Sequence, residues 1–504
     1  MNKRITNPNI LKLLEKWKTI WALDHVFMLA NWDLQTYMPS EGGEARAEAL
    51  SKIVSLQRRL FLDKEFVKLI KQCSNEKSLN DLERGTVRIL SRRLNFYQRL
   101  PQEFLEDFTK VVSEGHLIWK EAKEKNNFEI FKPHLEKIVF LSRKKAKYLG
   151  YKEHPYDALL DEFEEGLTAK EVGKYFDLLG KPLQKLLRNI LKSKNYKKEH
   201  KLEHEKYDIE KMKEVNSKLI GLLHSNINQL RLDDSAHPFS VSLGKGDSRI
   251  TTRYREKDFS ESFFATIHEY GHALYELQSH EELNYTPLAQ GISMAVHESQ
   301  SHFWEDFVGK NTNFLEFVLP LLYKSGGKLS KLNVKDFYEY INLVRPSFIR
   351  VEADEVTYHF HILIRFELEK ALIEGSLKVS DLPKVWNEKY HKYLGIIPKN
   401  DSEGVLQDVH WSEGLIGYFP AYSLGISLSA MLNYNFEKEV GDIKKYSGSK
   451  KGFSEIRTWL KEKVHKYGST YVFHDLVRKS CGEEFTPRYL LEHLGEKYGR
   501  IYGF

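Results

Sequence analysis

The chain has 504 residues, 41% hydrophobic and 29% charged, so we expect a packed globular protein. Its 77 Lys and Arg residues against 71 Asp and Glu residues leave a formal charge of only +6, which predicts a mixed surface and no nucleic-acid partner. Its two cysteines, Cys73 and Cys481, exclude a disulfide scaffold and predict a reducing, cytoplasmic location.

Apolar residues are spread along amphipathic stretches, and none forms the roughly 18-residue apolar run of a membrane span. The first residues also lack the apolar stretch of a signal peptide, so we expect no membrane partner. Helical spacing of apolar residues predicts helices over residues 9–31, 46–61, 66–95, 101–126, 133–149 and 168–192. The Lys- and Glu-rich stretch 192–214 is typical of a solvated helical face and turn.

The pattern changes near Ala236, where alternation replaces helical spacing. Phe239, Val241 and Leu243 alternate with polar residues, glycines interrupt the pattern, and residues 250–254 resume it, which predicts a β-hairpin. A D-x-x-E cap at residues 258–261 then predicts the start of a helix. Helical patterns continue to the C-terminus, with loops predicted near residues 325–327, 398–404 and 446–452.

The helix after the hairpin contains His268-Glu269-Tyr270-Gly271-His272. Histidines at i and i+4 lie one turn apart on one face, so their imidazoles can bind one metal ion, and zinc favours neutral histidine nitrogen. Glu269 can reach a water on that metal and act as the general base. Gly271 costs about 1 kcal/mol relative to alanine in mid-helix, so we expect a packing or functional reason for it.

A catalytic zinc site needs a third protein ligand and an open position. The metzincin extension requires Gly at 275 and His at 278, but this chain has Tyr275 and Gln278, which excludes that class. We favour Glu298, because the intervening chain is long enough for one loop and a returning helix. His297 is the runner-up, and three roles stay open for His302: ligand, support for a ligand, or solvated histidine. The remaining acidic candidates continue the first helix and are less plausible: Glu276, Glu281 and Glu282.

A carboxypeptidase must pair the free terminal carboxylate of its substrate, and arginine does so bidentately. Arg350, near the apolar to acidic start of a predicted helix, is one candidate for this role. Arg249 and Arg253, both predicted to lie on the second hairpin strand, are the others, and a surface ion pair is the usual role of a lone arginine. An aromatic and polar cluster further along the chain supplies candidate hydrogen-bond donors to an oxyanion: His410, Tyr418 and Tyr422.

These segments together resemble one family, the zinc carboxypeptidases typified by the thermostable carboxypeptidase Taq. The resemblance covers nearly the whole chain and rests on blocks in order: His237-Pro-Phe239, Asp247 to Thr251, His268 to His272, His297 to Gln300, Ile349 to Asp354, and Gly404 to Trp411. Near the N-terminus, Trp32-Asp33, residues 37–39 and Arg46-Ala47 also look similar. Six short blocks around a zinc signature make the resemblance specific.

The resemblance implies a large, mainly α body with a deep substrate groove and a small antiparallel β-hairpin beside the zinc helix, similar in outline to neurolysin and angiotensin-converting enzyme. It implies that His268, His272 and Glu298 bind the metal and that Glu269 is the base, and it adds His237 to the predicted substrate-binding residues. Members of this family are cytosolic homodimers that remove C-terminal residues with broad specificity, poorly at proline, using zinc or cobalt. We expect the same, with thermostability, of this chain.

Two other functions remain open. One is an oligo-endopeptidase with the same zinc chemistry, and the other is a non-enzymatic helical binding protein with a vestigial site. An aminopeptidase is disfavoured, because no G-x-M-E-N block is present to hold a free amine. Since the blocks run from Trp32 to Tyr422, we expect residues 1–504 to form a single catalytic domain, in one body or two lobes.

Overall fold

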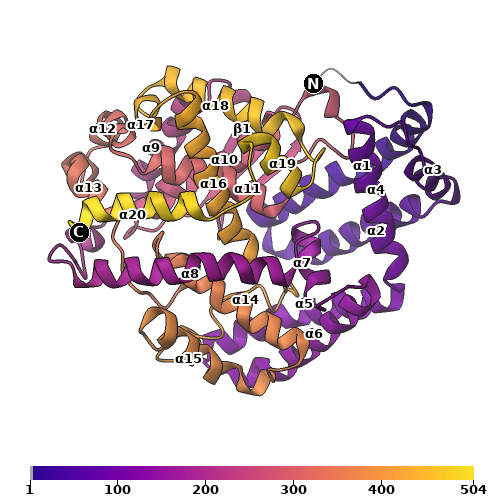
Figure 1. Ribbon diagram of the computed structural model, residues 1–504, viewed down its shortest axis with the longest axis horizontal. Coiled ribbons are helices and arrows are strands. Elements are labelled where there is room, and N and C mark those ends of the chain that lie inside the picture. The colour runs from indigo at the N-terminus through magenta and orange to yellow at the C-terminus, as the bar shows by residue number, and fades with distance from the viewer. Residues whose placement is uncertain (1–3) are drawn as a thin grey trace. The chain divides into compact units, whose positions relative to one another are not determined.

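The computed structural model describes residues 4–504, which fold into two compact units. Unit 1 comprises the chain up to Tyr97, Glu199–Ile341 and Leu432–Phe485. Unit 2 comprises Gln98–Lys198, Asn342–Met431 and Thr486–Phe504. Both units are mainly helical, and the described residues contain only one small sheet, so the predicted mainly α fold is confirmed (Figure 1).

Unit 1 contains most of the helices from both ends of the chain. They are α1 (Pro8–Thr36), α2 (Gly43–Phe61), α3 (Lys64–Ser74), α4 (Asp81–Arg99, except its last residues), α9 (Ile209–Leu223), α10 (Phe259–Leu277), α11 (Met294–His302), α12 (Thr312–Ser325), α13 (Val334–Ile341), α17 (Ile443–Tyr446), α18 (Lys450–Lys463) and α19 (Phe473–Cys481). Unit 2 contains α5 (Gln102–Glu124), α6 (Phe128–Leu149), α7 (Asp157–Phe163), α8 (Ala169–Lys192), α14 (Tyr358–Glu374), α15 (Leu382–Leu394) and α20 (Arg488–Tyr502). The helix α16 (Pro420–Glu439) begins in unit 2 and ends in unit 1.

The helices predicted from apolar spacing in the first half of the chain are present, with one correction. The stretch 66–95 contains two helices, α3 and α4, rather than a single one. The Asn80 side chain accepts hydrogen bonds from the backbone N–H groups of Leu82 and Glu83, and the Glu83 carboxylate accepts one from the N–H of Asn80. This reciprocal cap starts a new helix within an amphipathic stretch that otherwise continues. The short helix α7 was not predicted.

The predicted hairpin is confirmed, and the sheet has a further strand. Strand β2 (Ser240–Gly244) pairs antiparallel with β3 (Asp247–Thr252), and β1 (Leu230–Asp234) pairs parallel with β3, in the order β1-β3-β2. Gly244 and Gly246 have φ of +127° and +84°, which only glycine adopts without strain at the hairpin turn. β1 was missed because it is short and ends in two aspartates, which are depleted in strands.

Helix α10 lies in the core of unit 1 and packs against β2, β3, α9, α11 and the π-helical turn η5 (Phe303–Gly309) (Figure 1). Asp258 caps its first turn by accepting a hydrogen bond from the N–H of Glu261 at 2.9 Å, as the D-x-x-E pattern predicts. The helix is buried on nearly every side, and its core positions include Phe263, Ile267 and Leu274. The H-E-x-x-H segment therefore lies on a rigid element, with Glu269 buried and His268 partly exposed.

In unit 2, α14 occupies the corresponding central position and packs against α6, α8 and α15. Most of its residues are buried, including the charged side chains of Arg365 and Glu369. Both charges make hydrogen bonds with the segment 404–417, which contains the predicted oxyanion donor His410. A fully buried charge is costly unless it is paired, so these contacts fix that segment to the core of unit 2.

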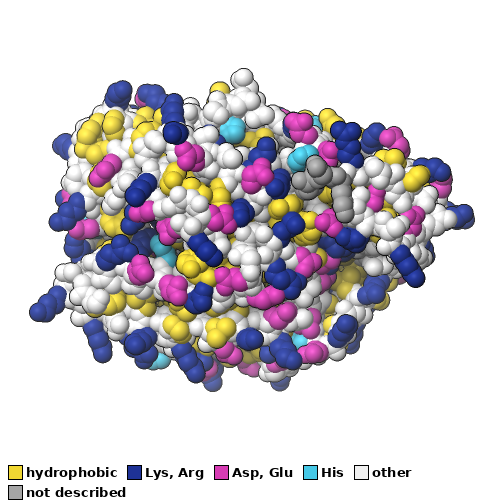
Figure 2. All heavy atoms as spheres, turned by 45° about the horizontal axis from the view of Figure 1, so that its top comes forward, with side chains coloured by type: hydrophobic (Ala, Val, Ile, Leu, Met, Phe, Trp, Pro, Cys, Tyr) yellow, Lys and Arg dark blue, Asp and Glu magenta, His cyan; other side chains and the backbone are white. Residues whose placement is uncertain are grey.

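The side chains at the surface are mixed in charge, as the net charge predicts. Lys and Arg side chains alternate with Asp and Glu across the face in Figure 2, with small hydrophobic groups between them. Among residues 4–504, no helix is long and apolar enough to cross a membrane. The substrate groove implied by the resemblance stays a prediction.

Candidate metal centre

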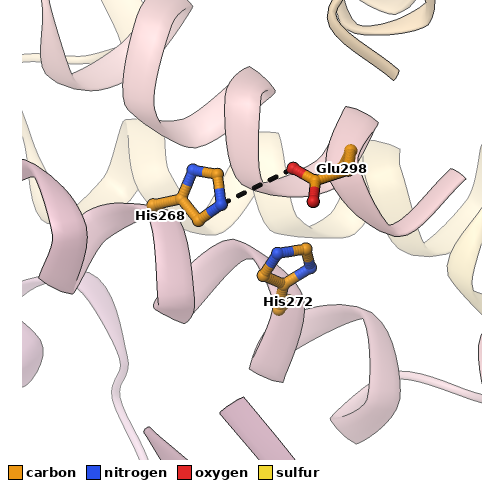
Figure 3. Close-up of side chains that lie close together, drawn as sticks. All are labelled: His268, His272 and Glu298. Atoms are coloured by element: carbon orange, nitrogen blue, oxygen red, sulfur yellow. Dashed lines mark ion pairs between the residues drawn. The ribbon is translucent and has the colours of Figure 1, made fainter. Parts of the chain in front are cut away.

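Three side chains from α10 and α11 converge in unit 1: His268, His272 and Glu298. The two histidines lie one helical turn apart, with ring centroids 5.0 Å from each other. Glu298 points toward them from α11, and its Oε2 lies 3.6 Å from Nε2 of His268 (Figure 3). One potential ligand atom from each residue lies within 4.8 Å of the others, so the three side chains can share one ion.

Gly271 explains how α11 comes so close to α10. A Cβ at this position would lie 2.6 Å from the carbonyl oxygen of Gln300 and 2.6 Å from the Cα of Ser301, both backbone atoms of α11. Only glycine permits this approach, which puts Glu298 on the histidine side of α10. The mid-helix glycine therefore has the packing reason expected from the sequence.

A second layer of side chains supports this group and was not predicted from the sequence. Nδ1 of His268 donates a hydrogen bond to Oε2 of Glu305 at 2.8 Å, which leaves Nε2 free to face Glu298. His302, whose role the sequence left open, donates from Nδ1 to Asp306 at 2.7 Å. Its Nε2 lies 3.9 Å from Oε2 of Glu298. The spacing of Asp306 and Lys310, an acid and a base at i and i+4, was the available signal.

The candidate ligands other than His302 are occupied elsewhere. Nε2 of His297 lies 2.9 Å from Oε1 of Glu276, and the same oxygen accepts a hydrogen bond from the N–H of Gly291 at 2.8 Å. Glu281 pairs with Lys245 at 2.6 Å. Glu282 pairs with Arg4 at 3.2 Å. These contacts favour Glu298 over the alternatives considered from the sequence.

Burial and charge strongly perturb the ionisable groups around α10. Burial raises the pKa of Glu269 to about 7, with His268 opposing the effect and Glu298 adding to it. Burial alone would lower the pKa of His268, but Glu305, Glu298 and Glu269 outweigh it and raise the pKa to about 9. Burial and the neighbouring histidines hold the pKa of His272 well below its usual value, which keeps that imidazole neutral.

The supporting carboxylates are held in their ionised form. Burial opposes ionisation of Glu305, but Lys310 and His268 outweigh it and lower the pKa to about 2. The pKa of Asp306 is likewise well below its usual range, because Lys310 and His302 outweigh the effect of burial. Two anionic acceptors therefore lie beside the two histidines that they orient.

The residues present fit a divalent metal ion. Two imidazoles and one carboxylate are the ligand types of catalytic zinc sites. Nδ1 of His272 is buried and has no hydrogen-bond partner among residues 4–504. At least one nitrogen of this ring is therefore not engaged by the protein. A hydrogen-bonded carboxylate behind a histidine ligand, as Glu305 is behind His268, is the usual arrangement at metal sites.

Two predicted substrate-binding residues also belong to unit 1. His237 is exposed in the segment between β1 and β2, and its carbonyl accepts a hydrogen bond from Oγ of Ser235 at 2.5 Å. Arg253 follows β3 directly, rather than lying in the strand, and is half-buried with no ion pair among residues 4–504. By contrast, Arg249 pairs through Nε and Nη2 with Asp247, at 3.0 Å for each contact.

The other predicted substrate-binding residues cluster in unit 2. Arg350 is 6% exposed; it donates from Nε to Asp408 at 2.9 Å and from Nη1 to the hydroxyl of Tyr358 at 2.9 Å. Its guanidinium also lies 5.1 Å from the ring centroid of Tyr422. Asp408 pairs in addition with the fully buried Arg365, with 2.6 Å between Oδ2 and Nη2. Asp408 and Arg365 were not assigned roles from the sequence.

His410 lies beside the tyrosines of this cluster. Its Nε2 lies 3.3 Å from the hydroxyl of Tyr422, and its ring centroid lies 5.5 Å from that of Tyr418. Burial, reinforced by Arg350, lowers the pKa of His410 to about 3, so the imidazole is neutral. The structure therefore brings Arg350, His410, Tyr418 and Tyr422 together within unit 2, while His237 and Arg253 belong to unit 1.

Comparisons with known proteins match this chain to carboxypeptidases over nearly its whole length. The family model described as "Carboxypeptidase Taq (M32) metallopeptidase" matches residues 12–498. Thermostable carboxypeptidase 1 of Pyrococcus furiosus is 43% identical over 499 residues, covering 99% of this chain and 100% of that protein. Carboxypeptidase 1 of Bacillus subtilis is 37% identical over 503 residues, covering 98% of this chain and 97% of that protein. A solved structure of the Pyrococcus furiosus carboxypeptidase has a TM-score of 0.96 at 43% identity, covering 98% of this chain and 100% of that one.

A helical fold with a two-histidine, one-carboxylate group that could hold a metal ion is typical of a metallopeptidase. The chain belongs to the carboxypeptidase Taq (M32) metallopeptidase family. It is accordingly a metal-dependent carboxypeptidase, as the resemblance predicts, and its substrates are peptides. The alternative of an oligo-endopeptidase is not favoured.

Proposed function

We propose that the metal of this carboxypeptidase is zinc, held by His268, His272 and Glu298, and that Glu269 is the general base. The observation that carries the proposal is the convergence of one ligand atom from each of these three residues within 4.8 Å of one another, on one face of α10. Glu269, next to the first ligand, is 7% exposed and therefore shielded from bulk water. Cobalt, which accepts the same nitrogen and oxygen ligands, is expected to replace zinc.

In this mechanism the protein orients the reactants and moves one proton. The bound ion supplies Lewis-acid polarisation of the scissile carbonyl and of the attacking water. The carboxylate of Glu269 takes a proton from that water as it attacks the last peptide carbonyl. It then gives the proton to the nitrogen of the leaving amino acid, which would otherwise depart as an unstable anion. Glu305 keeps the ring of His268 in one orientation throughout.

We propose further that Arg350 pairs with the terminal carboxylate of the substrate, with Arg253 as the second candidate. The charges around Asp408 support this role, because the guanidiniums of Arg350 and Arg365 share that one carboxylate. The group therefore has a surplus positive charge in a buried setting, which an anion would neutralise. His410 and Tyr422 are proposed as donors to the oxyanion, and His237 and Tyr418 as further substrate contacts.

Replacing Glu269 with glutamine tests the base. The variant Glu269→Gln should bind one zinc ion per chain like the wild type, but lose at least about 100-fold in turnover of a peptide ladder read by mass. The ladder also tests the class, because a carboxypeptidase removes residues one at a time from the free C-terminus and ignores C-terminally amidated peptides. Substantial turnover by the glutamine variant would reject Glu269 as the base.

The remaining proposals follow from family membership and from the sequence. We propose broad specificity with poor cleavage at proline, a cytoplasmic location, thermostability, and a homodimer whose subunits each use residues 1–504 as one catalytic domain. The curated relatives from Pyrococcus furiosus and Thermus thermophilus are named thermostable carboxypeptidases, which supports the expectation of heat stability. Sedimentation at micromolar concentration should give twice the mass of one chain, and a single-chain mass would reject the dimer.

A further inference from the structure

A lysine behind the metal centre connects two of the supporting pairs. Nζ of Lys310 lies 2.7 Å from Oε1 of Glu305 and 2.8 Å from Oδ1 of Asp306. The second oxygen of Glu305 accepts the hydrogen bond from His268. The second oxygen of Asp306 accepts the one from His302. One ammonium group therefore joins two carboxylate–histidine pairs, which we call the Lys310 clamp.

The π-helical turn η5 makes this arrangement possible. The N–H of Lys310 donates to the carbonyl of Glu305 at 2.9 Å, which is the i to i+5 bond of a π-helix. In a regular α-helix, Lys310 would lie above the residue four positions earlier, Asp306. The wider π-turn brings both Glu305 and Asp306 within reach of the same ammonium.

We propose that Lys310 is a positioning residue of the metal site that acts through two arms. Through Glu305 it orients His268. Through Asp306 it orients His302, whose Nε2 lies next to Glu298 but, at 3.9 Å from Oε2, beyond hydrogen-bond distance. The proposal rests on the proposed assignment of His268 and Glu298 as ligands. It adds a residue that holds His268 through Glu305, and the neighbour of Glu298, His302, through Asp306.

Removing the ammonium would leave an unstable arrangement. The side chains of Glu305 and Asp306 are only 17% and 7% exposed, so their negative charges are weakly screened by water. Without Lys310, the two negatively charged carboxylates repel each other, so one of them must turn away, and the histidine that it holds loses its acceptor. The ring of Phe264, with its centroid 5.7 Å from Nζ, gives the ammonium a further favourable contact at this position.

The variant Lys310→Met tests the clamp, because methionine retains the aliphatic length without the charge. We expect its zinc dissociation constant, measured by competition with a chelator, to rise about 10–100-fold, the usual effect of losing an outer contact to a metal ligand. The visible absorption of the cobalt-loaded variant should differ from that of wild type, since the ligand geometry is altered. Lys310→Arg should recover part of the affinity, because it restores the charge with a different shape.

Lys466→Met is the matched control, because Lys466 is similarly buried (18% exposed) but pairs with a single carboxylate, Glu462. It should bind zinc like the wild type. Wild-type zinc affinity together with an unchanged cobalt spectrum in Lys310→Met would overturn the clamp. A fall in affinity of the same size in Lys466→Met would also overturn it, because the effect would then come from any buried lysine.

Two further variants separate failure of the clamp from failure of the proposed site. His268→Ala should abolish stoichiometric zinc binding; if it does so while Lys310→Met has no effect, the site stands and the clamp is rejected. If His268→Ala retains full binding, the proposed ligands themselves are wrong, and the clamp is rejected with them. The double variant Lys310→Met with Glu305→Ala should lose less affinity than the two single losses combined, because both act through the same arm.

Discussion

Replacing Gly271 with alanine adds one methyl group where α10 and α11 touch. The new Cβ would lie 2.6 Å from the carbonyl oxygen of Gln300 and from the Cα of Ser301. Both are backbone atoms, so relief requires α11 to move away as a unit, together with Glu298. Overpacking of this kind costs up to about 3 kcal/mol, while the better helix propensity of alanine returns about 1 kcal/mol. We expect a net loss of about 2 kcal/mol in the free energy of unfolding.

The assay compares thermal unfolding of the metal-free protein with its zinc affinity. A loss of about 2 kcal/mol should lower the unfolding midpoint of this 504-residue chain by about 2 °C. Displacement of Glu298 should also weaken zinc binding. Gly221→Ala is the control, because Gly221 lies in helix α9 with no atom within 4 Å of its added Cβ, and it should leave the midpoint unchanged or slightly higher. A Gly271→Ala variant with wild-type midpoint and wild-type zinc affinity would refute the reasoning.

Three further predictions address the substrate anchor, a buried acid and the metal. Arg350→Ala should reduce turnover of free-carboxylate peptides far more than any residual cleavage of C-terminally amidated ones, and equal losses would reject its pairing with the terminal carboxylate. Burial raises the pKa of Glu369 to about 7, so this group binds a proton more tightly in the folded than in the unfolded state. Stability should therefore fall by about 3 kcal/mol between pH 4.5 and 7 because of this one group. Because glutamine does not titrate, the unfolding midpoint of Glu369→Gln should fall less between pH 4.5 and 7 than that of the wild type. An equal fall in both proteins would contradict the raised pKa of Glu369. Zinc at 100 times its dissociation constant should stabilise the wild type against thermal unfolding by about 2.7 kcal/mol. The same zinc concentration should leave the stability of His268→Ala unchanged. Equal stabilisation of both proteins would place the metal elsewhere.

The features that could be predicted from the sequence are those set by local spacing. Histidines at i and i+4 lie on one face of any helix, so the pairing of His268 with His272 follows once α10 is recognised. The hairpin β2-β3 follows similarly from alternation and two glycines. The sequence favours Glu298 because the chain between it and His272 has room for a loop and a returning helix. What the sequence did not show is that Gly271 lets α11 approach closely enough for the carboxylate to reach the histidines.

The Lys310 clamp could not be predicted from the spacing of residues, because it depends on a change from α-helix to π-helix. Read as an α-helix, residues 302–310 place His302, Asp306 and Lys310 on one face and turn Glu305 away from Lys310. The sequence contains no proline or other simple signal for a π-turn at this point. The turn packs closely against α10, since a Cβ on Gly309 would lie 3.1 Å from Cδ1 of Ile267. Local spacing along the chain therefore does not predict the winding that joins Glu305 to Lys310.

The charged residues of α14, in unit 2, also could not be placed from the spacing of residues along the chain. A helix containing Arg365 and Glu369 at i and i+4 is typical of an exposed ion pair, yet both side chains are fully buried. Arg365 donates to Asp408, and Glu369 accepts hydrogen bonds from Nε1 of Trp411 and the N–H of Gly417. Burying two charges is favourable only when each is satisfied, so α14 and the segment 404–417 must form together. Asp408 is then fixed from one side by Arg365, and its remaining oxygen is available to orient Arg350. The position of the proposed carboxylate anchor thus depends on a pairing that no spacing along the chain encodes.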